Sequence, residues 1–355
     1  MAGAKGYSSY RGRGGKGKIF LAVLLILVIA AACLVIFFQQ HVVYDGNGRP
    51  QIVLPWQNGE PESTAPLPEE NPPEVDLIVQ APEPEEPSRS LTLSLNAAPL
   101  TMEAWSAWQA GVQNQERAAV AVTLKDSAGK IYFDAARAIS GAVQTKADTA
   151  GAISAAVSTD GLQVTARFSC LHDARAANSN VRAMGLRNTG GYIFYDGNNS
   201  QWLDPSKPAA REYLCGLAAE IAALGVDEIL VTDLSYPTEG KVHKIDYNGD
   251  GPIEENLAQL LRELRAVLEP LGVTLSVELP ESVVSLGFDE ISGQKLSVIA
   301  PLVDRVYSVT AADRIEALSS AVAAVSESTV FVPELPAGTP TEQLTGMFLL
   351  LPAEG

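Results

Sequence analysis

The sequence predicts an α/β fold: a (β/α)8 TIM-like barrel preceded by one transmembrane helix and a Pro/Glu-rich linker. Three observations indicate it. Residues 91–355 alternate short apolar strands with amphipathic helical segments, residues 19–38 form an uncharged apolar run, and residues 39–90 are rich in proline and acid. With 355 residues, 46% of them hydrophobic, the chain can bury a sizeable core and is too long for one minimal domain.

The first 38 residues predict a membrane anchor. Residues 1–18 carry five Lys and Arg and no acid, which is typical of a basic cytoplasmic tail. Residues 19–38 can cross about 30 Å of hydrocarbon as a transmembrane helix, at about 1.5 Å per residue. Because positively charged flanks stay in the cytoplasm, we expect a single-pass protein of the cell membrane whose C-terminal domain is extracellular. A cleaved signal peptide and a lipid-modified Cys33 are weaker alternatives, since apolar sequence continues beyond Cys33.

Residues 39–90 predict an extended acidic, Pro-rich linker. They hold ten acidic residues and ten of the chain's 22 prolines, and both proline and like-charge repulsion oppose compact structure. Within 41–55, Asp45-Gly46 and Asn47-Gly48 tolerate positive φ between two apolar runs, a pattern compatible with a small hairpin. The folded domain is expected to cover residues 91–355.

This domain contains eight predicted strands. A helical stretch at 102–112 comes first, and the strands follow at 118–126, 162–170, 190–197, 227–233, 273–280, 304–309, 329–335 and 346–352. The helical candidates lie at 149–158, 174–184, 209–225, 252–272, 291–302 and 311–325, with a short one from Thr341. A helix between consecutive strands implies parallel neighbours joined by right-handed crossovers. Eight such units favour a closed barrel, and no glycine-rich dinucleotide fingerprint follows the first strand to support an open doubly wound sheet.

Period-two alternation predicts which side chains point into the barrel. The inward sets are Thr165, Arg167 and Ser169 in the strand at 162–170, and Thr274, Ser276 and Glu278 in the strand at 273–280. Active sites of this architecture gather at the carboxyl ends of the strands. That rule selects Lys125, Asp126, His172, Asp173, Tyr195, Asp196, Asp233, Tyr236, Glu278, Tyr307 and Glu334.

Two stretches carry a family resemblance. One is WLDPSKPAAREYLCGLAAEIAALGVDEILVTDLSYPTEGK at 202–241, and the other is VTLKDSAGKIYF at 122–133. They resemble the glycoside-hydrolase (TIM-barrel) domain family of bacterial extracytoplasmic, membrane-anchored proteins, whose patterns read roughly W-L-D-P, a helix, then G-F-D-E-I-Q-F-D-Y-V-R-F-P, and D-V-K-D-x-G. With weaker matches around ARFSCLHD and VDRVYSV, the similarity spans most of 115–352. The resemblance implies a barrel related to sugar-cleaving enzymes.

The chain departs from the family pattern at its acidic positions. Thr232 stands where the family has Asp in F-D-Y, with Asp233 one place later, and Thr123 replaces the Asp of the first strand. Ser235 stands where the family has Arg before F-P. Shifting a side chain by one residue in a strand moves it to the opposite face unless a bulge intervenes. The alternative to an enzyme is therefore a catalytically degenerate barrel that binds glycan or a protein partner without cleavage.

If the family's chemistry persists, it needs two carboxyl groups that flank a glycosidic bond. The best pair is Asp233, as nucleophile or base at the end of the fourth strand, and Glu278, as general acid at the end of the fifth. Glu334, at the end of the seventh predicted strand, is the alternative general acid. The competing interpretation is structural: Asp233 caps its loop, and Glu278 pairs with an inward base such as Arg167.

Further rim residues are predicted to contact a glycan, because aromatic faces stack on sugars and polar groups bind hydroxyls. These substrate-binding candidates are Lys125, Asp126, Arg167, Tyr195, Asp196, Trp202, Tyr236 and Tyr307. Core packing is the competing fate of the aromatic residues, and turn formation is that of Asp126. The expected ligand is a neutral or cell-envelope glycan, since the net charge of −17 disfavours nucleic acid.

No cofactor or metal site is expected. The three histidines are widely separated, so none of the usual zinc spacings occurs. The segment 246–257 begins like a calcium loop, but Leu257 stands where a bidentate Glu belongs, and a turn that leads into a helix is the preferred interpretation. Cys170 and Cys215 are expected to be two free buried thiols.

Overall fold

The computed structural model describes residues 42–44, 50–52, 90–95, 97–112, 119–247 and 251–352. The chain divides into two compact units, Met1–Gln80 and Ala81–Gly355. The predicted transmembrane segment, most of the linker and residues 248–250, in the segment that begins like a calcium loop, lie outside the described residues. Within the described ranges, every helix is too short or too polar to span a bilayer.

The first unit contains one described pair of strands. β1 (Val42–Tyr44) runs antiparallel to β2 (Pro50–Ile52), with Val42 opposite Ile52. This pair lies where the Asp-Gly and Asn-Gly dipeptides indicate a hairpin.

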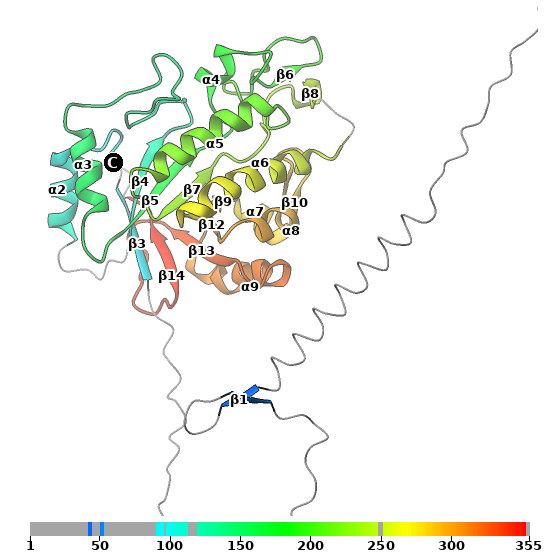
Figure 1. Ribbon diagram of the computed structural model, residues 1–355. Helices are drawn as coiled ribbons and strands as arrows, with labels where there is room; N and C mark the ends of the chain where they lie inside the picture. The colour runs from blue at the N-terminus through cyan, green and yellow to red at the C-terminus, as the bar shows by residue number, and fades with distance from the viewer. Residues whose placement is uncertain are drawn as a thin grey trace, which may run out of the picture. The chain divides into compact units, whose positions relative to one another are not determined.

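Eight parallel strands of the second unit close into a barrel. Figure 1 labels these strands. Around the barrel they are β3 (Ser90–Leu95), β4 (Ala119–Lys125), β5 (Gln163–Ser169), β7 (Glu228–Thr232), β9 (Thr274–Glu278), β12 (Arg305–Val309), β13 (Val330–Leu335) and β14 (Met347–Leu350), which pairs with β3. The predicted TIM-like α/β barrel is confirmed.

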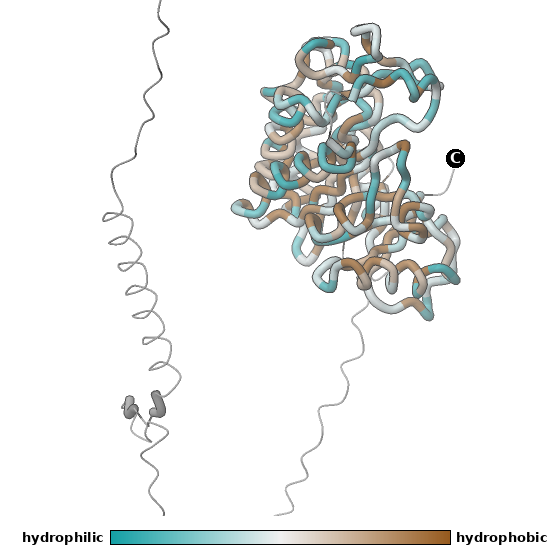
Figure 2. Tube along the Cα trace, turned by 90° about the vertical axis from the view of Figure 1, so that its right-hand side faces the viewer, coloured by the Kyte–Doolittle hydropathy of each residue, from teal (hydrophilic) through white to brown (hydrophobic). Residues whose placement is uncertain are grey.

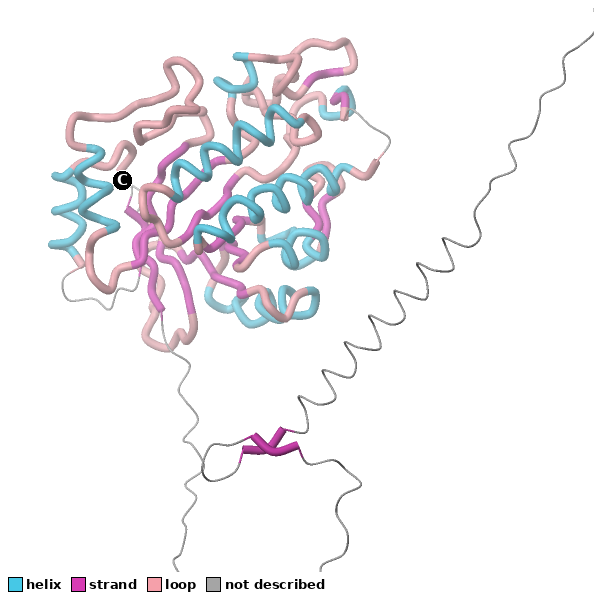
Figure 3. The backbone as a smooth tube through the Cα atoms, viewed as in Figure 1, coloured by secondary structure: helices cyan, strands magenta, loops and turns pink. Residues whose placement is uncertain are grey.

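Helices surround the strands (Figure 3). They are α2 (Met102–Gly111), α3 (Thr149–Val157), α4 (Ala174–Ser179), α5 (Pro208–Ala222), α6 (Ile253–Leu268), α7 (Glu281–Leu286), α8 (Leu296–Ile299) and α9 (Ile315–Val325). In α6, Leu257, Leu260, Leu261, Leu264 and Leu268 are buried, at the three- and four-residue spacing of one helix face. Hydrophobic and hydrophilic residues accordingly alternate along the elements around the barrel (Figure 2).

Two sequence predictions about individual elements are wrong. Residues 190–197 form no barrel strand but belong to a long connection between β5 and α5, in which β6 (Arg187–Asn188) pairs with β8 (Ile245–Asp246). The eighth barrel strand is β3 instead, which begins at the last residue of the predicted linker. The short helix predicted from Thr341 is also absent, because turns lead from β13 to β14.

The inside of the barrel is filled in layers. An apolar cluster of Ala121, Leu230, Tyr307, Val332 and Leu349 occupies the middle. Towards the amino ends of the strands lies Glu228, which accepts hydrogen bonds from Thr165, Ser276, Arg305 and Tyr307. Towards the carboxyl ends lie Arg167 and Glu278. The alternation predicted for β5 and β9 is therefore confirmed.

Candidate functional site

A cleft of about 390 Å³ opens at the carboxyl ends of β7 and β9, and we call it the mouth cleft. Its lining includes Asp233, Ser235, Thr238, Glu278, Glu281 and Asp289. β7 and β9 are hydrogen-bonded neighbours. The two acids that the sequence selects as a pair therefore share one cavity, whereas Glu334 lies in β13 and is fully buried.

Asp233 reaches the mouth cleft through an unusual backbone conformation. Its φ of 52° lies in the left-handed region, which Asp tolerates better than most residues. Its Oδ2 accepts a hydrogen bond of 2.5 Å from Oγ of Ser169, an inward residue of β5, and lies 3.5 Å from Oγ1 of Thr232. The one-residue shift from the family position therefore leaves the carboxylate at the barrel mouth, because the chain has already left the strand geometry.

Arg167 joins the two glutamates of the mouth. It forms an ion pair with Glu278 and donates from Nη1 to both carboxylate oxygens of Glu334, at 3.2 Å each. Burial works against the charge of Arg167, but Glu334 and Glu278 outweigh it and raise the pKa of the guanidinium. The structural interpretation of Glu278, an ion pair with Arg167, thus holds together with its position on the cleft.

The two glutamates differ in their surroundings. The Glu278 side chain is 28% exposed, whereas that of Glu334 has no exposed surface. Burial raises the pKa of Glu334 from 4.5 to about 7, with Arg167 opposing the shift and Glu278 adding to it. Glu334 can therefore hold a proton near neutral pH while Glu278 faces the cavity.

Lys125 was predicted to bind substrate but lies inside the protein, 1% exposed. Its Nζ is 3.0 Å from Oδ2 of Asp173 and donates to the carbonyl of Ser169 at 2.6 Å. Asp173 also caps α4, accepting from the amide of Ala176 at 2.8 Å. Lys125 thus contacts the backbone of Ser169, whose hydroxyl donates to Asp233, so the buried ion pair helps to position Asp233 in the mouth cleft.

Two further candidate acids, Asp126 and Asp196, organise loops. Asp126 accepts hydrogen bonds from the amides of Ala128 and Lys130 and from the hydroxyl of Tyr132. Asp196 accepts hydrogen bonds from the amides of Asn198 and Ser200 and from the indole of Trp202. Each carboxylate therefore organises the loop that follows it, through two backbone amides and one aromatic side chain.

The candidate aromatic residues are mostly buried. Trp202 stacks on His172 with 4.2 Å between ring centroids, and the hydroxyl of Tyr236 accepts a hydrogen bond from Asn256. Tyr307 belongs to the apolar middle layer, and its hydroxyl points to Glu228, away from the mouth. Tyr195 is 48% exposed and lines a separate cavity.

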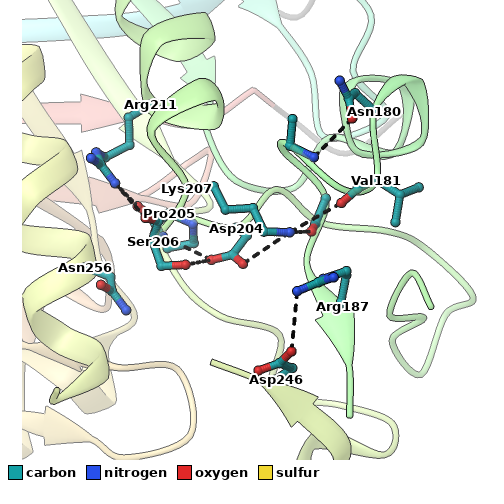
Figure 4. Close-up of polar contacts among 12 residues, drawn as sticks. Asn180, Val181, Arg187, Asp204, Pro205, Ser206, Lys207, Arg211, Asp246 and Asn256 are labelled. Carbon is teal, nitrogen blue, oxygen red and sulfur yellow. Dashed lines mark hydrogen bonds and ion pairs between the residues drawn. The ribbon is translucent and has the colours of Figure 1, made fainter. Parts of the chain in front are cut away.

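The W-L-D-P motif of the resemblance has a structural role (Figure 4). The buried Asp204 accepts from the amide and hydroxyl of Ser206, and Nζ of Lys207 lies 3.6 Å from its carboxylate. Lys207 in turn donates to the carbonyls of Val181 and Gly185. These contacts fasten the start of α5 to the connection that precedes it.

Cys170 and Cys215 are both free and buried. Burial raises the pKa of each thiol, so neither is a reactive thiolate at neutral pH. Within the described ranges, no group of three or more His, Cys, Asp and Glu side chains is placed to hold a metal ion.

The family described as "Putative glycosyl hydrolase domain" matches residues 101–310. The chain belongs to this family. The resemblance in 202–241 is thereby confirmed. No curated protein matches the chain.

Several solved structures are similar to the chain. The PgaB (BpsB) glycoside hydrolase domain from Bordetella bronchiseptica has a TM-score of 0.51 and 15% identity, over 75% of this chain and 94% of that one. A hypothetical protein from Ruminiclostridium thermocellum ATCC 27405 has a TM-score of 0.44 and 22% identity, over 53% and 96%. The GH20 β-N-acetylhexosaminidase from Streptomyces coelicolor A3(2) has a TM-score of 0.44 and 12% identity, over 75% and 54%. At 15% identity, the similarity to the PgaB domain shows the fold alone.

Proposed function

We propose that this glycosyl-hydrolase-like domain cleaves a neutral or cell-envelope glycan in the mouth cleft, with Asp233 and Glu278 as the two working carboxylates. One observation carries the proposal: both acids line a single cavity at the carboxyl ends of neighbouring barrel strands. Sites of this architecture lie at that end. The family description and the fold shared with the PgaB glycoside hydrolase domain support the same chemistry.

The surroundings suggest a role for each acid. Asp233, oriented by the Ser169 hydroxyl, acts as nucleophile or base. Glu278 faces the cavity and donates the proton to the departing sugar oxygen. The water that completes hydrolysis supplies the proton that restores the acid. Glu334, whose pKa burial raises to about 7, lies behind Glu278 on the same arginine. Arg167 fixes both glutamates and touches no substrate in this scheme.

We also propose that residues 19–38 anchor the protein in the cell membrane, with residues 1–18 in the cytoplasm. The linker at 39–90 then holds the barrel away from the lipid surface on the extracellular side. The uncharged apolar run and its basic flank support this placement.

A second candidate function is glycan or protein binding without cleavage. It is favoured by Thr123 and Thr232, which stand at family carboxylate positions, and by Arg167, which engages both remaining glutamates. A carboxylate that is held in an ion pair with an arginine favours its ionised form and is a poorer proton donor. Such a barrel can retain its cleft and lack turnover.

Hydrolysis itself separates the two functions. The full-length protein is incubated with a panel of neutral and cell-envelope glycans, and new reducing ends are counted. Asp233→Asn and Glu278→Gln serve as matched controls that keep the shape of each side chain. Turnover that both substitutions abolish supports the enzyme. Binding without turnover supports the second function, and turnover unchanged in both variants removes the proposed site.

A further inference from the structure

A second cavity, of about 340 Å³, lies in the loops beyond the mouth cleft, and we call it the Lys241 pocket. Its lining includes Asn188, Ile193, Tyr195, Asp196, Lys241 and Lys244. Two segments build it: the connection that contains β6, and the stretch between β7 and β8 (Figure 1). The β6–β8 pairing and a 2.8 Å hydrogen bond from the amide of Thr189 to the carbonyl of Lys244 hold the two together.

The pocket brings together positive charge and an aromatic face. Lys241 and Lys244 are both exposed, and among the described residues neither forms an ion pair. Asp196, the acid in the lining, directs its oxygens to two amides and the Trp202 indole. Glu239 adds an acid at the edge, beside Gly197. Tyr195, 48% exposed, lines the same pocket as the two lysines.

This combination suits a sugar that carries a negative charge. A half-exposed tyrosine packs against the apolar face of a pyranose ring, and its hydroxyl binds at the edge. Two ammonium groups without carboxylate partners attract an anionic substituent, and each offers it three rotatable N–H donors. A single charged unit also avoids the repulsion that the whole chain, at −17, exerts on a long polyanion.

The pocket is also close to the mouth cleft. Thr238 lines the mouth cleft and Gly240 lines the Lys241 pocket, so the same short segment borders both. Two residues span at most about 7 Å. The two cavities therefore lie within reach of one oligosaccharide.

We propose that the Lys241 pocket is a subsite for an anionic sugar residue, one that carries a carboxylate or a phosphate, in the glycan that enters the mouth cleft. The inference rests on the proposed function, which takes the ligand to be a glycan. It does not require that the glycan be cut. The two lysines select the charged unit, and Tyr195 supplies the stacking surface.

Binding to the full-length protein tests it. Calorimetric titrations at low salt use three probes: glucuronate for the carboxylate, glucose 1-phosphate for the phosphate, and cellotetraose as the neutral reference. We expect one of the anionic probes to bind at least tenfold more tightly than cellotetraose. The double variant Lys241→Gln/Lys244→Gln should lose at least tenfold of that affinity, Tyr195→Ala should lose several-fold, and Tyr195→Phe should keep most of it.

Matched controls make the outcomes decisive. Lys130→Gln/Lys146→Gln removes the same charge outside the pocket and should leave binding unchanged. Glu278→Gln should abolish hydrolysis while the anionic probe still binds, so failure of the enzyme proposal is distinguishable from failure of the subsite. The inference is overturned if cellotetraose or an acidic Glu-rich peptide binds as tightly as the anionic sugars. Equal loss in both double variants, or no binding of either anionic probe by folded protein, also overturns it.

Discussion

The two ends of the barrel interior hold similar residues in different surroundings. At the amino end, Glu228 is buried and accepts hydrogen bonds from four side chains, with Arg305 as its ion-pair partner. At the carboxyl end, Glu278 also pairs with an arginine, yet its side chain is 28% exposed and lines a cavity. Asp233 beside it is held through Oδ2 by the Ser169 hydroxyl and by a longer contact with Thr232.

This difference separates structural acids from available ones. A carboxylate whose lone pairs are filled by protein donors in a closed core contributes to stability and to a unique packing. A carboxylate with an open side can accept or donate a proton to a ligand. Residue type and ion pairing are alike at the two ends, so exposure to the cavity is what distinguishes them. The following substitutions test that distinction.

The largest effect is expected at Asp233. Replacing it with Asn keeps the hydrogen-bonding shape but removes the base or nucleophile, so the rate of glycan hydrolysis should fall by about 10³-fold or more. The free energy of unfolding should change by less than about 1 kcal/mol, because the side chain lines a cleft. Steady-state kinetics and urea denaturation of the same preparation measure both. A large loss of stability with unchanged turnover would move Asp233 to the structural class.

The opposite result is expected for Glu228→Gln. This substitution leaves Arg305 without its buried partner, and breaking such a pair destabilises by about 3–5 kcal/mol. Catalytic turnover of the molecules that remain folded should be unchanged. Denaturant midpoints of Glu228→Gln and Glu278→Gln measured side by side should differ, with the Glu278 variant less destabilised because Arg167 keeps Glu334 as a second partner. Equal midpoints would contradict the distinction between a structural Glu228 and an available Glu278.

A pH effect of up to about 3 kcal/mol is expected from Glu334. Its pKa rises on folding from 4.5 to about 7, because burial disfavours the carboxylate. The folded protein therefore holds a proton that the unfolded chain releases, and this contribution to stability is complete below about pH 4.5 and disappears as the pH rises through 7. Glu334→Gln should flatten the fall of unfolding free energy between about pH 5 and 7. An identical profile in wild type and variant would mean that Glu334 is ionised throughout.

The smallest expected effect is at Asp126, a candidate that the structure assigns to a turn. Asp126→Ala removes the acceptor for two amides and the Tyr132 hydroxyl, which should cost about 1 kcal/mol of stability. Glycan binding and turnover should stay within about twofold of wild type. A selective loss of binding at unchanged stability would instead place Asp126 in the site.

Sequence periodicity predicted the barrel well where strands and helices alternate cleanly. It selected residues 190–197 in place of β3, because Tyr192, Ile193 and Phe194 have strong β-propensity, whereas SLTLSL directly follows a Pro-rich stretch. Strand pairing decides such cases, since β3 closes the barrel between β14 and β4. Local propensity carries no information about that closure.

The site was predictable in part for the same reason. Alternation correctly turned Arg167 and Glu278 inward, and their contact follows from their positions on the barrel wall. The positive φ of Asp233 was not predictable, since Asp at a strand end adopts several conformations. The burial of Lys125 depends on Asp173, a partner that follows a different strand, which no local pattern reveals.

The central claim is that a glycan is cut between Asp233 and Glu278. A crystal structure of the full-length Asp233→Asn variant, soaked with an oligosaccharide that the wild type hydrolyses, tests it most directly. We expect an uncleaved glycosidic oxygen within hydrogen-bond distance of the Glu278 carboxyl, with the substituted side chain at position 233 on the other side of the same bond. An oligosaccharide bound elsewhere on the barrel, with the mouth cleft empty, would contradict it.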